Sequence, residues 1–279
     1  MKRFESEYRL RPFFLDGTAG KLFALCYEPT GGARGQVLFC PPFAEEMNKS
    51  RRMTAMTARR LAANGFRVLT LDLYGTGDSA GIFDDARWQI WIDDLVVGYH
   101  WLMETGADST VLWGTRLGAS MALTVATQCR IRTGQVMLWQ PVLYGAAFMT
   151  QFLRLKLAAE LTGAGPKTTT ADIRAAARNG EAVEVAGYAL HPELIEAIDA
   201  LDFRRLDVWP GVRIAWIDLG KGPHPEPGPA SRKICEAWLE SGIDLEISAV
   251  AGESFWTTPE ITVVPELIDR TIDHLARTD

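Results

Sequence analysis

Gly114-Thr115-Arg116-Leu117-Gly118 is the stretch that decides the fold of this chain. It follows the short apolar run Thr110-Val111-Leu112-Trp113 and precedes an apolar segment, residues 119–129, that has a helical pattern. This order predicts a strand, a sharp turn and a helix. Two glycines suit such a turn, because a residue without a Cβ lets the chain bend sharply and lets the helix pack close to the strand. The turn presents the side chain at its centre, and here that side chain is Arg116.

Strands and helices alternate on either side of this turn. The sequence predicts strands at residues 36–40, 66–72, 135–140, 212–219 and 245–250. It predicts helices at residues 50–64, 86–104, 231–240 and 259–276. Near the start, residues 9–15 and 21–27 flank a glycine-containing turn and indicate an antiparallel hairpin. Such alternation favours right-handed βαβ units, so we expect a mostly parallel central sheet flanked by helices.

Residues 145–206 break this alternation. Their pattern is mostly helical, with a polar stretch at residues 163–170. We therefore expect a helical cap inserted within a single α/β domain that spans residues 1–279.

Bulk composition limits the classes of protein that the chain can represent. The 279 residues are 47% hydrophobic, which is enough for a large core in one or two domains. The net charge of −6 argues against nucleic acid or anionic lipid as a partner. The four cysteines are widely spaced, the N-terminus lacks an apolar signal-like segment, and no apolar run reaches about 20 residues. We expect a cytoplasmic protein without a membrane span, and the oligomeric state stays open.

Four blocks at ordered positions resemble those of α/β-hydrolases. Asp72-Leu73-Tyr74-Gly75-Thr76-Gly77-Asp78-Ser79 is similar to the turn that follows the fourth strand of these proteins. Residues 114–118 occupy the place of the nucleophile elbow, where the family carries Gly-x-Ser-x-Gly. Cys40-Pro41-Pro42-Phe43 stands at the oxyanion loop, and residues 250–256 stand at the loop that carries the catalytic histidine. The resemblance covers nearly the whole chain and implies the α/β-hydrolase fold.

Further motifs are similar to those of a narrower family, the exosortase A system-associated hydrolase 2 family. They are Pro41-Pro42-Phe43-Ala44-Glu45-Glu46-Met47-Asn48-Lys49-Ser50-Arg51-Arg52-Met53, the Arg-Leu-Gly-Ala that starts at Arg116, and Gly252-Glu253-Ser254-Phe255-Trp256. This resemblance implies a protein associated with bacterial exopolysaccharide and protein-sorting systems.

The chain departs from the hydrolase pattern at the catalytic positions. A serine triad needs an alcohol, an imidazole and a carboxylate. Arg116 stands where the serine belongs, and a guanidinium stays protonated and cannot attack a carbonyl. The loop after residue 250 offers Glu253 or Ser254 in place of histidine, and Asp218 is a poorly aligned acid. The sequence therefore predicts a hydrolase fold without the usual Ser-His-Asp triad.

Arg116 needs a negative partner. A cation at a helix N-terminus costs about 0.3–1 kcal/mol, because it meets the positive end of the helix dipole. The candidates lie on loops at the carboxyl ends of the predicted strands, and they are Glu253, Glu45, Glu46 and Asp218. We predict an Arg116–Glu253 pair first. The pair could bind a carboxylate or phosphate or polarise a carbonyl, or it could merely fill a vacated catalytic centre.

Other candidate groups surround this predicted centre. The backbone N–H groups of Leu117 and Phe43 could form an oxyanion hole. Glu45 and Glu46 could perform acid–base chemistry, or they could simply begin a helix. Ser254 is a reserve nucleophile, His224 is the histidine to test, and Trp256 could line a pocket. The histidines show no metal-ligand spacing, and we expect no metal or cofactor.

Two functions follow from these observations. The first is hydrolysis or transfer of an acyl group, from an ester or thioester, at a site without a serine nucleophile. The alternative is a non-catalytic protein that binds an acyl or saccharide precursor, or a partner protein, of exopolysaccharide and exosortase systems.

Overall fold

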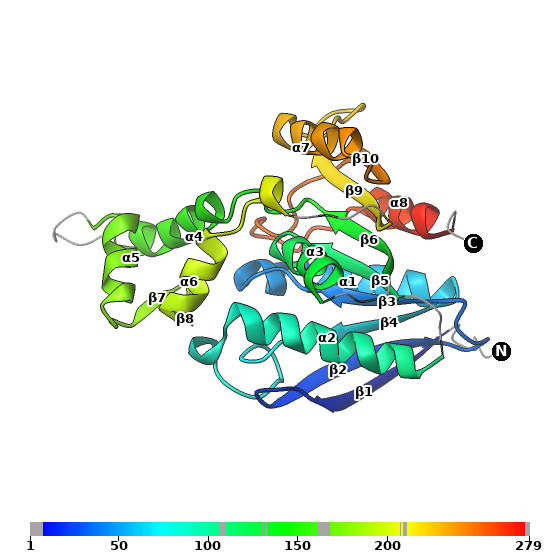
Figure 1. Ribbon diagram of the computed structural model, residues 1–279, viewed down its shortest axis with the longest axis horizontal. Coiled ribbons are helices and arrows are strands. Elements are labelled where there is room, and N and C mark those ends of the chain that lie inside the picture. Colours follow the sequence, from blue (N-terminus) through cyan, green and yellow to red (C-terminus); the bar gives the residue numbers. More distant parts are fainter. Residues whose placement is uncertain are drawn as a thin grey trace.

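The computed structural model describes residues 8–106, 110–129, 131, 133–160, 168–206, 208 and 211–276, and an eight-stranded sheet forms its centre (Figure 1). The strands are β1 (Tyr8–Asp16), β2 (Lys21–Pro29), β3 (Gly35–Cys40), β4 (Phe66–Leu71), β5 (Thr110–Thr115), β6 (Thr133–Trp139), β9 (Arg213–Gly220) and β10 (Leu245–Ala251). Their order is β1-β2-β4-β3-β5-β6-β9-β10. From β4 to β10 all neighbours are parallel, and the hairpin of β1 and β2 forms an antiparallel edge. The predicted fold class is confirmed.

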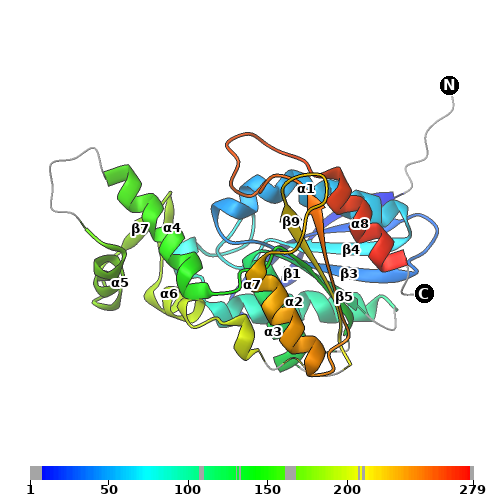
Figure 2. The ribbon, with the colours of Figure 1, turned by 90° about the horizontal axis from the view of Figure 1, so that it is seen from above.

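Helices cover both faces of the sheet. Helices α1 (Glu45–Ala63) and α8 (Pro265–Ala276) lie on one side, and α2 (Trp88–Glu104), α3 (Leu117–Gln128) and α7 (Pro229–Glu240) lie on the other (Figure 2). The residues of β3 alternate between the two cores: Val37 and Phe39 pack with the α1 face, and Leu38 packs with the α2 face. These three side chains are all buried, as expected for an interior parallel strand. Among the described helices, none has the length and apolar character to cross a bilayer.

Two helices begin elsewhere than predicted. Helix α1 starts at Glu45 instead of residue 50, and Ser50 is buried within it. Its first turn contains the acids Glu45 and Glu46, which interact favourably with the helix dipole. Helix α8 starts at Pro265 instead of residue 259, because proline is favoured in the first turn of a helix.

The predicted turn between a strand and a helix lies between β5 and α3. Arg116 is the single residue that separates them, with φ 57° and ψ −120°. A Cβ on Gly114 would lie 2.4 Å from the carbonyl oxygen of Gly118. A Cβ on Gly118 would lie 2.1 Å from the carbonyl oxygen of Cys40. Both glycines are therefore needed for the close approach of α3 to the ends of β5 and β3.

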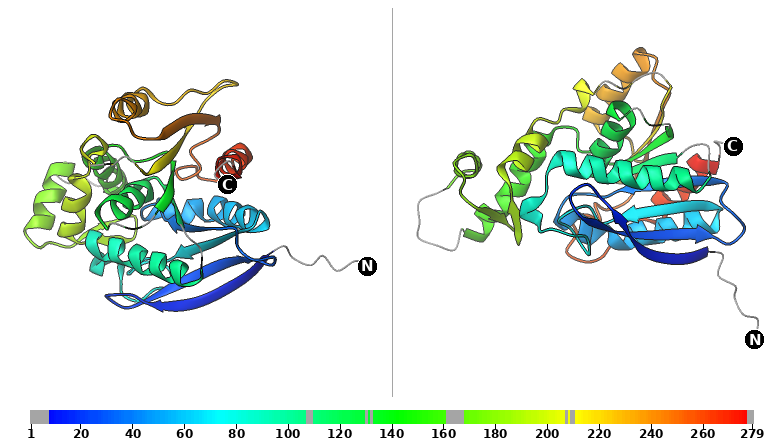
Figure 3. Two further views of the ribbon diagram at one scale, coloured as in Figure 1. Left: turned by 45° about the vertical axis from the view of Figure 1, so that its right-hand side comes forward. Right: turned by 60° about the horizontal axis from the view of Figure 1, so that its bottom comes forward.

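The segment between β6 and β9 leaves the layers of the sheet and its helices. It contains α4 (Gly145–Glu160), α5 (Thr170–Arg178), β7 (Val183–Val185), β8 (Tyr188–Leu190) and α6 (Pro192–Asp199). These elements lie together at one end of the molecule, beside the carboxyl ends of the central strands (Figures 1 and 3). The small hairpin of β7 and β8 was not expected from the sequence. We call residues 145–206 the cap segment; part of its predicted polar stretch, residues 163–167, lies outside the described residues.

A buried carboxylate on α2 holds the loop that follows β4. Asp94 accepts a hydrogen bond from the backbone N–H of Tyr74 at 2.8 Å, and Trp91 Nε1 donates to the carbonyl oxygen of Tyr74 at 3.0 Å. The second oxygen of Asp94, Oδ1, is buried and has no hydrogen-bond partner among the described residues. Burial raises the pKa of Asp94 to about 6.

The elevated pKa of Asp94 predicts a dependence of stability on pH. An unfolded aspartate titrates near pH 4, so between about pH 4 and pH 6 the folded protein binds more protons than the unfolded chain. The free energy of unfolding therefore falls as the pH rises through this window. Asp94→Asn keeps a hydrogen-bond acceptor and does not titrate. We expect the free energy of unfolding of this variant, relative to that of the parent, to rise by about 2–3 kcal/mol as the pH increases from 4 to 7. Urea unfolding at several pH values measures this difference. A constant difference would contradict the prediction. Asp273→Asn, at an exposed position of α8, is the control.

Candidate functional site

Arg116 projects from the turn between β5 and α3 in a strained backbone conformation. Its φ of 57° is unusual for a residue that has a Cβ. Ala44 and Gln140 also have positive φ values, of 48° and 42°. Ala44 precedes α1, and Gln140 follows β6. Strain of this kind is concentrated at functional sites, where the surrounding structure enforces it. Three such positions at the carboxyl ends of adjacent strands indicate a site there.

The partner of Arg116 is Glu46. Arg116 Nε and Nη2 each donate to Glu46 Oε1 at 3.1 Å, and Arg116 Nη1 donates to the carbonyl oxygen of Gln140 at 3.3 Å. The side chains of Arg116 and Glu46 are each 15% exposed. The guanidinium carbon lies 4.9 Å from the ring centroid of Trp256 and 5.9 Å from that of Phe148. Arg116 is thus neutralised by one carboxylate and bordered by two aromatic rings.

The predicted Arg116–Glu253 pair is wrong. Glu253 follows β10 as expected, but its side chain is exposed. The next residues of that loop, Phe255 and Trp256, are buried and occupy the interior. The hydrophobic gain from burying two aromatic side chains orients the loop, and Glu253 is left on its outer side.

Glu46 has one engaged oxygen and one oxygen without a partner. Its Oε2 atom is buried and receives no hydrogen bond from the described residues. Burial raises the pKa of Glu46, and the charge and hydrogen bonds of Arg116 oppose this rise. The carboxylate is therefore held on one side, while its other oxygen can accept a proton or a hydrogen bond from a bound molecule.

A cavity of about 440 Å³ opens in front of this pair. Its lining combines the charged groups Glu45, Glu46, Lys49 and Arg116 with aromatic and aliphatic side chains. Helix α4 of the cap segment contributes Phe148, Gln151, Phe152 and Leu155 to the wall, and the remaining lining residues are Phe43, Gln140, Leu219, Ser254, Trp256 and Thr257. The volume is sufficient for a small organic ligand.

The two predicted oxyanion donors lie on segments that meet beside this cavity. Leu117 is the first residue of α3, so its N–H group has no acceptor within the helix. Phe43 lines the cavity. The segments are brought together by Gly118, whose backbone lies against the carbonyl oxygens of Cys40 and Pro41.

The structure separates the remaining predicted residues into two groups. Glu45, Ser254 and Trp256 line the cavity. Asp218 is buried within β9, where it accepts hydrogen bonds from Trp216 Nε1 at 2.7 Å and from the backbone N–H of Gly228 at 3.0 Å. Asp218 does not line the cavity, and its carboxylate holds the loop after β9. His224 is exposed on that loop and does not line the cavity.

Sequence reasoning missed four polar residues of the site, which are Lys49, Gln140, Gln151 and Thr257. Gln140 accepts a hydrogen bond from the backbone N–H of Leu219 through its side chain at 2.6 Å, and it binds Arg116 through its backbone carbonyl. Lys49 Nζ donates to the carbonyl oxygen of Thr257 at 3.3 Å. The available signal for Gln140 was its position, because it is a polar residue between the end of a strand and Pro141. In the part of the chain that is described, no group of three or more His, Cys, Asp or Glu side chains could hold a metal ion.

The strand order, the strained turn and the cavity at the strand ends define a protein of the α/β-hydrolase class. Comparison with family models identifies the family. Residues 31–200 match the model described as serine aminopeptidase, S33, and the chain belongs to that family. Comparison of the sequence with curated proteins gives no match.

Solved structures share this fold at low sequence identity. Est1E from Butyrivibrio proteoclasticus, solved with bound ferulic acid, has a TM-score of 0.64 at 13% identity and covers 95% of this chain and 98% of its own. DcsB in complex with a substrate analogue has a TM-score of 0.63 at 14% identity and covers 97% of this chain and 100% of its own. XC6422 from Xanthomonas campestris, described as a serine hydrolase without a lid, has a TM-score of 0.56 at 15% identity, with coverages of 99% and 97%.

Proposed function

We propose that this protein hydrolyses a carboxylic ester or thioester with water as the nucleophile and Glu46 as the general base. Glu46 Oε2 takes a proton from water while the water oxygen bonds to the acyl carbon. The carbonyl oxygen becomes an oxyanion that faces the N–H groups of Phe43 and Leu117. Collapse of this intermediate breaks the bond to the leaving group, which receives the proton from Glu46. The products are the carboxylic acid and the alcohol or thiol.

The observation that carries this proposal is the unpartnered oxygen of Glu46. A buried polar atom normally has a hydrogen-bond partner, and its lack of one costs free energy. Glu46 Oε2 is buried beside the cavity without such a partner among the described residues. A general base must have an oxygen available for the proton that it removes, and its pKa should approach the working pH. Burial shifts the pKa of Glu46 upward, which is the direction that the second condition requires.

Arg116 serves as the positioning residue of this site. Its two hydrogen bonds to Oε1 orient the carboxylate, and its charge opposes protonation of Glu46. Membership of the serine aminopeptidase family and the fold shared with Est1E, which was solved with bound ferulic acid, support acyl chemistry at this cavity. Because Glu46 must be ionised, we expect the rate to fall with decreasing pH at a value above the usual glutamate pKa.

The test compares two carboxylates that both stood as candidate bases. Glu46→Gln keeps an oxygen for Arg116 and removes the base, so kcat/KM for p-nitrophenyl butyrate and for a butyryl thioester should fall by about 10²-fold. Glu253→Gln should change it less than about threefold, because Glu253 is exposed and does not line the cavity. Equal activity of the parent and Glu46→Gln would overturn the proposed mechanism.

A second candidate function is ligand binding without turnover. Its support is the guanidinium that occupies the elbow position between Glu46, Trp256 and Phe148. In this case the cavity binds an acyl or saccharide precursor of exopolysaccharide systems, as the resemblance of residues 41–53 implies. Such a ligand raises the melting temperature through mass action and is recovered unchanged. Multiple-turnover hydrolysis that copurifies with the protein would reject this alternative.

A further inference from the structure

A second cavity, of about 300 Å³, lies on the α1 face of the sheet. Its floor is the surface of β2, β3 and β4, and its wall is α1. Apolar and aromatic floor residues include Phe23, Leu25, Tyr27 and Phe39, and the wall residues include Met47, Arg51, Ala55 and Arg59. The residues of β2 on the opposite face, Leu22, Ala24 and Cys26, are fully buried. Helix α1 thus leaves part of one sheet face uncovered.

The uncovered face continues onto the edge strand. In the antiparallel register, Phe14 lies opposite Phe23, and Pro12 lies opposite Leu25, so each pair shares a face. Phe14 is 55% exposed, and its ring centroid lies 5.7 Å from that of Phe23. The apolar surface therefore extends from the cavity towards the edge of the sheet, where an alkyl chain could be buried.

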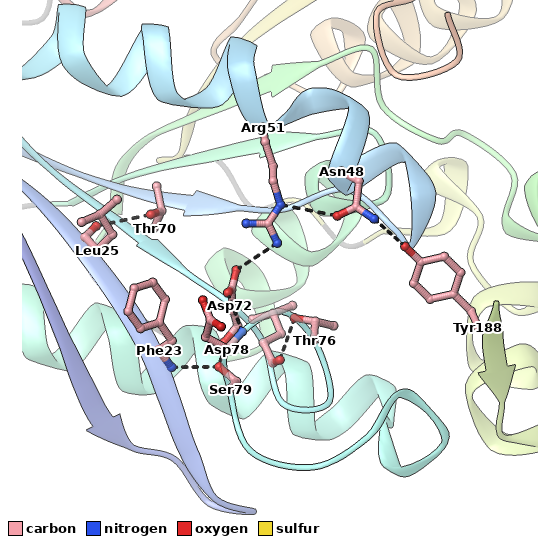
Figure 4. A network of polar contacts seen from close by, with 11 residues as sticks. Phe23, Leu25, Asn48, Arg51, Thr70, Asp72, Thr76, Asp78, Ser79 and Tyr188 are labelled. Carbon is pink, nitrogen blue, oxygen red and sulfur yellow. Dashed lines mark hydrogen bonds and ion pairs between the residues drawn. The ribbon is translucent and has the colours of Figure 1, made fainter. Parts of the chain in front are cut away.

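Positive charge stands above this apolar floor. Arg51 and Arg59 lie eight residues apart on α1, which is about 12 Å along the helix axis. Figure 4 shows the guanidinium of Arg51 between Asn48, whose Oδ1 accepts from Arg51 Nε at 3.4 Å, and Asp72. The nearest guanidinium atom lies 3.9 Å from Asp72 Oδ1, and Asp72 Oδ2 already accepts from the backbone N–H of Asp78. Asp72 therefore offsets Arg51 at one end of the cavity.

Arg59 stands at the other end, beside Tyr27. Burial raises the pKa of Tyr27, and the nearby Arg59 guanidinium opposes that rise. No salt bridge to Arg59 is found among the described residues. By contrast Arg60, the next residue, pairs with Asp269 at 2.8 Å. The cavity thus combines an apolar floor with an uncompensated cation at one end.

We propose that this cavity, which we call the α1 groove, binds a small anionic amphiphile, an alkyl carboxylate. The carboxylate lies against Arg59, and the alkyl chain lies on Leu25 and Phe23 towards Asp72. An apolar chain at that end avoids contact between two carboxylates. The site is separate from the cavity of Glu46, because the segment 41–47 stands between them: Pro41, Pro42 and Met47 line the α1 groove, while Phe43, Glu45 and Glu46 line the other cavity.

Octanoate is the probe, and calorimetric titration of the whole chain is the measurement. We expect Arg59→Gln to weaken octanoate binding about tenfold, as loss of one charge-assisted contact requires. Arg60→Gln, the matched control on the same helix, should leave the Kd within about twofold. Leu25→Trp, which fills the floor, should weaken binding at least as much as Arg59→Gln. Octanol has the alkyl chain without the negative charge, and inorganic phosphate has the charge without the chain. Each should bind more weakly than octanoate.

The proposal is overturned by any of three results. Octanoate that binds equally to the parent and to Arg59→Gln, but not to Phe152→Trp, occupies the cavity of Glu46 instead. No octanoate binding, together with binding to phosphatidylglycerol vesicles, identifies a membrane contact. No binding of either probe leaves the groove without the proposed ligand. Ester hydrolysis by these variants is measured separately, so failure here does not bear on the role of Glu46.

Discussion

Gly118→Ala is expected to destabilise the protein by about 3 kcal/mol or more, because the added methyl group meets backbone atoms that cannot rotate away. The new Cβ would lie 2.1 Å from the carbonyl oxygen of Cys40 and 2.6 Å from that of Pro41. To make room, α3 must shift away from the end of β3, and the shift separates the Phe43 and Leu117 segments. Urea unfolding measures the loss of stability.

Gly31→Ala is the matched control for this change. A Cβ on Gly31 has no neighbour within 4 Å, and its backbone does not have a positive φ. The same glycine-to-alanine substitution should therefore change stability by less than about 1 kcal/mol there. Equal effects at both positions would show that the contact between α3 and the residues after β3 does not constrain the fold.

Glu46→Ala is expected to destabilise the protein by about 3 kcal/mol, because it leaves the guanidinium of Arg116 without its partner in a largely buried setting. The double substitution Glu46→Ala with Arg116→Met removes both charges together, and Arg116→Met is the second single variant of the cycle. The cost of the double substitution should be smaller than the sum of the two single costs, since residues in contact are energetically coupled. Chemical unfolding of all four proteins gives the coupling free energy.

The former candidate partner provides the control for this cycle. Glu253→Ala should cost less than about 0.5 kcal/mol and should be additive with Arg116→Met, because Glu253 is exposed. An additive result for Glu46 and Arg116 would contradict the ion pair. Coupling between Glu253 and Arg116 would restore the pair that the sequence predicted.

The fold could be predicted from the sequence because its signals are local. Glycines at positions 114 and 118 between an apolar strand and an apolar helix specify the turn, and the turn was found where it was predicted. The alternation of strands and helices likewise specified the sheet. These patterns depend on residues that are neighbours in the chain, so no knowledge of long-range contacts was needed.

The partner of Arg116 could not be chosen from local patterns. The incorrect choice of Glu253 has an identifiable origin. Glu46 is 70 residues earlier in the chain than Arg116. It reaches Arg116 because α1 begins at Glu45, whereas the sequence placed the helix start at Ser50. Ala44 makes no side-chain cap and gave no signal of a helix start. Glu46 was one of four candidate partners, and the misplaced helix start left no reason to place it ahead of Glu253.

The contribution of the cap segment to the cavity wall could not be predicted from the sequence, for a different reason. Phe148, Phe152 and Leu155 form an ordinary apolar face of α4, and their sequence spacing does not distinguish contact with the core from contact with a cavity. Only the placement of α4 beyond the strand ends, seen in Figure 3, gives those side chains their role.

The segment 41–47 has a cavity on each side, and this arrangement has a thermodynamic consequence. Pro41 and Pro42 restrict the backbone of this segment, whose residues border both cavities. If octanoate in the α1 groove changes the affinity of the Glu46 cavity for its ligand, that ligand must change the affinity for octanoate by the same factor. Each ligand is titrated into the free protein and into the protein saturated with the other ligand. The two orders of binding must give the same total binding free energy.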